Sequence, residues 1–107
     1  MIRRALKKEP NNGAYLDSLG WVEFRAGKFE QALTDLQRAA QNMTRDDPVV
    51  FEHLGDTYLK LNRVANAVES WQKALALDPP NRKIAEKIDS AKTKLSKGVV
   101  PPSNSLQ

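Results

Sequence analysis

A repeat of 35 residues is the feature that most limits what this chain can fold into. Shifting the chain against itself by 35 residues brings apolar and small residues into register over most of its length. The matching segments are Leu16 with Phe51, Leu19-Gly20 with Leu54-Gly55, Phe24 with Leu59, Ala32-Leu33 with Ala67-Val68, and Leu36-Gln37-Arg38-Ala39 with Trp71-Gln72-Lys73-Ala74. Such a period is typical of supersecondary units that bury a continuous core only when they stack.

Each unit is predicted to contain two helices, because its apolar residues recur at spacings of three and four. Gly27 is expected to separate the two helices of the first unit, and Asn62 stands at the matching place in the second. Both residue types tolerate the left-handed backbone that ends a helix. Asp47-Pro48 is a strong start signal, with a capping acid followed by proline at the first helical position. Asp78-Pro79-Pro80 is expected to stop the last helix of the second unit.

A further helix is predicted from about Arg82 to Lys97, with Asn81 as its cap. Its apolar residues are sparse, so it should have one narrow apolar face and one wet face: Ile84, Ala85, Ile88, Ala91 and Leu95. This is what the terminal capping helix of a stack requires. Residues 98–107 contain two prolines and no charged side chain, and a flexible tail is expected there.

The net charge of +4 is carried by the two ends of the chain. Residues 1–12 and 82–107 hold 10 of the 17 Lys and Arg, whereas residues 13–81 hold 7 basic and 10 acidic residues. Nucleic-acid binding would need a basic face within the folded body, so a nucleic-acid partner is not expected. No apolar run approaches the ~20 residues of a membrane-spanning helix, and no transmembrane segment is predicted.

Residues that could carry chemistry are few. The single histidine, His53, has no second His or Cys to share a metal, and Thr57 is the only hydroxyl within a helical turn. We therefore interpret His53 as a solvated helix residue. The five glycines are scattered and form no phosphate-binding loop. No catalytic residue, metal, cofactor or small-molecule substrate is expected, and the chain is interpreted as a protein without enzyme activity.

The repeat resembles the tetratricopeptide repeat (TPR), whose pattern is W-x2-L-G-x2-Y followed by G, A, a large apolar residue, A and P. The first unit offers Leu16, Leu19, Gly20, Gly27, Ala32, Leu36 and Ala39, and the second Phe51, Leu54, Gly55, Tyr58, Asn62, Ala67, Trp71, Ala74 and Pro79. Two departures occur. Glu23 takes the place of the family's tyrosine, and the segment from Met43 to Pro48 is one residue longer than the pattern. The segment from Tyr15 to Trp21 is similar to bacterial members.

The resemblance implies an all-α fold, a right-handed superhelical stack of antiparallel helix pairs closed by a C-terminal capping helix. It divides the chain into the end of a preceding repeat (1–12), two units (13–47 and 48–81), the capping helix (82–97) and the tail (98–107). The opening segment suggests a fragment of a longer protein. In this fold the first helix of each unit lines a concave face. The residues expected there are Asp17, Trp21, Phe24, Arg25, Glu52, Asp56, Leu59, Lys60, Lys83 and Lys87.

The two tryptophans are expected to differ in role. Trp71 stands at the family's large apolar position, which indicates a core residue. Trp21 is either a groove anchor for a ligand, a residue that packs on the preceding repeat, or a ring that fills space left by Glu23. The family's carboxylate clamp for chaperone tails requires Lys and Asn where this chain has Asp17 and Trp21, so that ligand is not expected.

The expected function is a protein-interaction scaffold that binds a peptide or helix with apolar anchors and some positive charge. A structural spacer or self-association module is the alternative, and a weak contact of the basic ends with nucleic acid or another acidic surface is the second alternative. A homodimer through an exposed N-terminal face is a further expectation. The compartment stays open between the cytoplasm and the cell envelope.

Overall fold

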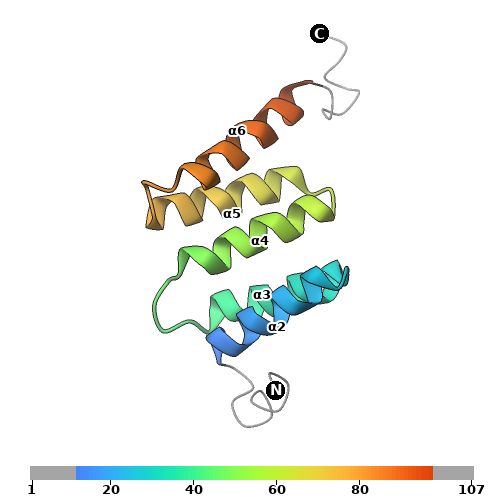
Figure 1. Ribbon diagram of the computed structural model, residues 1–107, viewed down its shortest axis with the longest axis vertical. Coiled ribbons are helices and arrows are strands. Elements are labelled where there is room, and N and C mark those ends of the chain that lie inside the picture. Colours follow the sequence, from blue (N-terminus) through green and yellow to red (C-terminus); the bar gives the residue numbers. More distant parts are fainter. Residues whose placement is uncertain (1–11, 98–107) are drawn as a thin grey trace.

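The computed structural model describes residues 12–97, and this part of the chain is built from helices without strands. The helices stack in chain order along the long axis of the molecule (Figure 1). Their bounds are Gly13–Arg25 (α2), Phe29–Gln41 (α3), Pro48–Lys60 (α4), Val64–Leu77 (α5) and Arg82–Lys97 (α6). The all-α stack of helix pairs with a last single helix is thus confirmed. The helix remnant expected in residues 1–12 and the tail expected in 98–107 lie, apart from Asn12, outside the described residues.

The helix ends follow the signals in the sequence. The Asp47 side chain accepts a hydrogen bond from the Val49 amide at 2.9 Å, and Pro48 follows as the first helical residue of α4. The Asn81 side chain accepts one from the Ile84 amide at 3.2 Å at the start of α6. Gly27 and Asn62 have φ values of +83° and +62°, so both linkers turn through the left-handed region. Each capped start and left-handed linker brings the next helix back against the previous one.

Small residues allow the two helices of each pair to approach closely. A Cβ on Gly20 of α2 would lie 2.7 Å from Leu36 Cγ of α3. A Cβ on Gly55 of α4 would overlap the indole of Trp71 on α5. The two glycines therefore sit where the large side chain of the partner helix crosses, which is the packing that the repeat predicts.

The apolar side chains form two neighbouring clusters. One joins α2, α3 and α4, with Leu16, Leu36, Val50 and Leu54 among its buried members. The other joins α5 and α6 and includes Trp71, which is 2% exposed. Trp71 is thus the core residue that the sequence predicts. Since partly buried Phe51 and Tyr58 of α4 pack against both clusters, α4 is the helix that connects the two halves.

Candidate functional site

Aromatic rings of α2 and α4 form a row on one side of the stack. Trp21 is stacked with Phe24 at 4.4 Å between ring centroids, and with His53 of α4 at 3.9 Å. Two rings that are both parallel to Trp21 and both about 4 Å away cannot occupy the same face of it, so the indole lies between them. Phe24 in turn meets the edge of Phe29 at 5.3 Å. We call Phe24, Trp21 and His53 the aromatic row.

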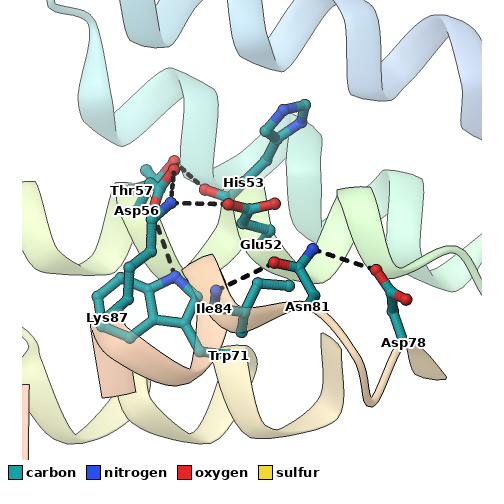
Figure 2. A network of polar contacts seen from close by, with 9 residues as sticks. All are labelled: Glu52, His53, Asp56, Thr57, Trp71, Asp78, Asn81, Ile84 and Lys87. Carbon is teal, nitrogen blue, oxygen red and sulfur yellow. Dashed lines mark hydrogen bonds and ion pairs between the residues drawn. The ribbon is translucent and has the colours of Figure 1, made fainter. Parts of the chain in front are cut away.

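His53 also contacts Asp17, which lies one turn before Trp21 on α2. Its Nδ1 lies 2.9 Å from Asp17 Oδ1, and the His53 and Asp17 side chains are 17% and 20% exposed. The Thr57 hydroxyl donates to the His53 carbonyl at 2.8 Å, inside α4 (Figure 2). The interpretation of His53 as a solvated helix residue is therefore wrong. Its ring is inserted between two helices, where a stacking partner and a hydrogen-bond partner are both within reach.

The next seam, between α4 and α6, is polar. Lys87 Nζ of α6 donates to Glu52 Oε2 at 2.8 Å and to the two Asp56 carboxylate oxygens at 2.9 and 3.1 Å (Figure 2). Asp56 also accepts a hydrogen bond from Trp71 Nε1 at 3.2 Å. A buried indole N–H requires a partner, and Asp56 supplies it. We call Glu52, Asp56, Trp71 and Lys87 the Lys87 network, and it ties α4, α5 and α6 together.

Two opposing effects act on the pKa of Lys87. Partial burial lowers it, but the hydrogen bonds and the negative charges of Asp56 and Glu52 together outweigh burial. The pKa of Lys87 is therefore raised above its ordinary value of 10.5. The ammonium stays charged throughout the neutral range and neutralises one of the two carboxylate charges that face it.

A groove of about 440 Å³ runs along this seam. Its lining combines apolar surface with charged groups of both signs: Glu52, Asp56, Leu59, Trp71, Lys83, Glu86, Lys87, Ser90, Ala91 and Lys94. We call it the α4–α6 groove. A larger hollow of about 770 Å³ lies between the start of α2 and the α3–α4 linker, and Asp17 is the only predicted site residue that lines it. The α4–α6 groove is the candidate site, because it gathers five of the ten.

The ten residues expected on one face thus fall into three groups. Glu52, Asp56, Leu59, Lys83 and Lys87 line the α4–α6 groove. Asp17, Trp21 and Phe24 belong to the seam between α2 and α4. Arg25 and Lys60 are exposed near the ends of their helices and line neither hollow.

Sequence reasoning missed some residues of this surface. His53 follows Glu52 directly and precedes Asp56 by three, so helical spacing alone could have placed it on the same side of α4. Ser90 and Lys94 continue the spacing of Lys83 and Lys87 along α6, and the same rule could have found them. The link from Trp71 to Asp56 left no such signal, because a tryptophan at a core position does not indicate where its N–H points.

Within residues 12–97, no group of three or more His, Cys, Asp or Glu side chains is arranged to hold a metal ion. None of the helices α2 to α6 combines the length and the apolar character that a membrane span requires.

Comparisons with known proteins agree on one family. Sequence models of the tetratricopeptide repeat match residues 1–49 and 48–81. DnaJ homolog subfamily C member 7 of Mus musculus is 32% identical over 90 residues, which are 82% of this chain and 18% of that protein. The chain therefore spans less than a fifth of the length of this curated relative.

Solved structures give the same answer. PilF of Pseudomonas aeruginosa superimposes with a TM-score of 0.81 at 27% identity, over 92% of this chain and 45% of that one. The first TPR of Spaghetti (RPAP3), bound to the HSP90 peptide SRMEEVD, gives 0.84 at 19% identity, over 90% and 75%. With the repeat pattern, the paired helices and these matches in agreement, the chain belongs to the tetratricopeptide-repeat family.

Proposed function

We propose that this chain binds a peptide or helical segment of a partner protein in the α4–α6 groove. TPR proteins in general act as protein-interaction modules rather than as enzymes, which sets the class of function. The observation that carries the finer proposal is the lining of the groove: the partly buried Leu59, with the buried Trp71 and Ala91 beneath, lies beside charges of both signs. Peptide grooves obtain affinity from apolar anchors and orientation from a few charged groups.

The charges of the groove favour a ligand that places a positive charge next to Glu52 and Asp56. Glu52 and Asp56 bring two carboxylates to the single ammonium of Lys87, so one negative charge of this cluster is left over. Lys83 and Lys94 are exposed on α6 and can contact acidic side chains of the same ligand. A segment with an apolar anchor, a basic group and flanking acids would be complementary to both the carboxylates of α4 and the lysines of α6.

The comparison with the peptide-bound TPR of Spaghetti (RPAP3) supports a peptide in this fold and says nothing of the ligand's sequence here. A carboxylate clamp is not part of the proposal. Asp17 stands where the clamp requires a lysine, and its carboxylate faces His53. A ligand terminus carrying the same negative charge would be repelled at that position.

Peptides selected from a random library on the immobilised chain, and then titrated in solution, provide the test. The double variant Lys83→Glu/Lys94→Glu reverses two charges in the groove. The control variant Lys28→Glu/Arg63→Glu makes the same change of net charge at exposed positions outside the groove. We expect the groove variant to weaken a selected peptide by tenfold or more, about 1.4 kcal/mol, and the control to bind as the native chain does.

The alternatives predict different outcomes. If both variants weaken binding equally and the affinity falls steeply with salt, a contact of basic residues with acidic surfaces is the better account. If selection returns no peptide that the native chain binds in solution, the repeats serve as a spacer or self-association module.

A further inference from the structure

We infer that His53 is the positioning residue that sets the spacing of α2 against α4, and with it the orientation of one repeat unit against the other. This inference goes beyond the proposed function, because no residue of α2 lines the α4–α6 groove.

Two contacts of different kinds fix the His53 ring. The stack with Trp21, with the ring planes 13° apart, sets the direction that the ring faces. The 2.9 Å contact of Nδ1 with Asp17 sets its position within that plane. Asp17 and Trp21 are four residues apart, so both contacts fall on one face of α2. One side chain of α4 is thereby held against two successive turns of α2.

The Trp21 side of this contact is rigid. The opposite face of the indole rests on Phe24, with the two planes 9° apart, and Phe24 is braced by the edge of Phe29 at the start of α3. Parallel rings cannot approach closer than van der Waals contact and have little freedom to separate without losing it. The aromatic row therefore limits both how close α2 and α4 can approach and how far they can separate.

Other contacts between the units lie elsewhere on the interface. Leu16 and Leu36 pack with Val50 and Leu54 in its apolar middle. On the α3 side, Gln37 Nε2 donates to the Tyr58 hydroxyl at 3.0 Å, and this contact is exposed. With the apolar middle as a pivot, the aromatic row controls how far α2 and α4 open on their own side.

The seam between α4 and α6 differs in stiffness. There a flexible lysine stem reaches two carboxylates, and ammonium contacts of this kind tolerate small displacements of the helices. The helix spacing is therefore held more rigidly at the α2–α4 seam, by His53, than at the α4–α6 seam.

Distance measurements between spin labels test this inference without any ligand. The native chain has no cysteine, so Val22→Cys on α2 and Gln72→Cys on α5, both exposed, can carry nitroxides that report the two units against each other. A second pair, at Gln72 of α5 and Asp89 of α6, does not span the α2–α4 seam and serves as the control. We expect His53→Ala to shift or broaden the first distance distribution and to leave the second unchanged.

Two further variants separate positioning from general stability. His53→Phe keeps a flat ring but lacks Nδ1, and should restore the native distance, because the spacing is set by the stack. Trp21→Ala removes the other half of the stack and should shift or broaden the first distance distribution as His53→Ala does. It provides the test if His53→Ala does not fold.

The inference is overturned if His53→Ala or Trp21→Ala keeps the native distribution, or if His53→Phe does not restore it. A loss of stability alone would lower the folded fraction without moving the distance in the folded molecules. Failure of peptide capture would refute the proposed function and leave these distances as they are.

Discussion

Replacing Gly55 by alanine tests the packing on which the whole stack depends. The added Cβ would overlap Nε1 and Cδ1 of Trp71 and would come within 2.7 Å of its Cε2. Contact between carbon atoms is favourable only at about 3.5–4.0 Å, so the indole must move. Trp71 is 2% exposed, and a packed interior has little room for such a shift.

The expected cost combines three effects. Overpacking of a core costs about 1–3 kcal/mol. Displacing the indole also stretches its hydrogen bond to Asp56, and a hydrogen bond to a charged group contributes about 1.5–3 kcal/mol. Alanine recovers about 1 kcal/mol through its better helix propensity. The free energy of unfolding should therefore fall by roughly 1.5–5 kcal/mol, and the melting temperature by ~6–40 °C for a domain of this size.

Urea titration followed by far-ultraviolet circular dichroism measures this change. Gly20→Ala is the matched control, because it introduces the same Cβ at the equivalent position of the first unit. There the new atom meets Leu36 Cγ at 2.7 Å and Cδ2 at 3.0 Å. This overlap is smaller than at Gly55 and breaks no hydrogen bond, so a smaller cost of about 2 kcal/mol or less is expected. If Gly55→Ala is within about 0.5 kcal/mol of the native chain, or if Gly20→Ala costs more, the packing argument fails.

Three other predictions concern the Lys87 network, the two left-handed linkers and self-association. Lys87→Met should lower stability by about 1–3 kcal/mol at pH 7, because it leaves Glu52 and Asp56 facing each other without their ammonium. The pKa of Lys87 is raised in the folded state, so the stability that Lys87 contributes is complete below its unfolded-state pKa and is lost as pH rises through its folded-state pKa. The difference in unfolding free energy between the native chain and Lys87→Met should therefore be constant from pH 7 to 9 and shrink at pH 11. A difference that stays constant up to pH 11 would contradict the pairing. Gly27→Ala should lower the free energy of unfolding by about 1–2 kcal/mol through backbone strain alone, since φ is +83° and nothing lies within 4 Å of the new Cβ. Asn62→Gly at the equivalent turn should be neutral or slightly stabilising. Thermal melts compare the two variants, and equal changes in stability would contradict the left-handed turns. Light scattering at rising concentration should detect a dimer if the N-terminal face self-associates. A constant monomer mass would contradict the predicted homodimer.

The sequence alone determined the helices and the way in which they pair. The recurrence of apolar residues at three and four, the capping side chains of Asp47 and Asn81, and the turns at Gly27 and Asn62 are local features, and each acts within a few residues of its own position. The small residues that recur after 35 positions added the pairing, because a glycine leaves room for a large side chain of the helix that packs against it. Trp71 could be placed in the core because it stands at the family's large apolar position.

Only the tertiary structure decided which polar and aromatic groups meet across the seams between helices. Lys87 reaches Glu52 and Asp56 over 35 and 31 residues of chain, and His53 reaches Asp17 over 36. Such contacts depend on the angle and the offset of one helix against the next, to within about an ångström, and no local pattern encodes these quantities. A single histidine therefore gave no sign in the sequence that it lies between two units, although its helical spacing from Glu52 and Asp56 could have placed it on the correct face.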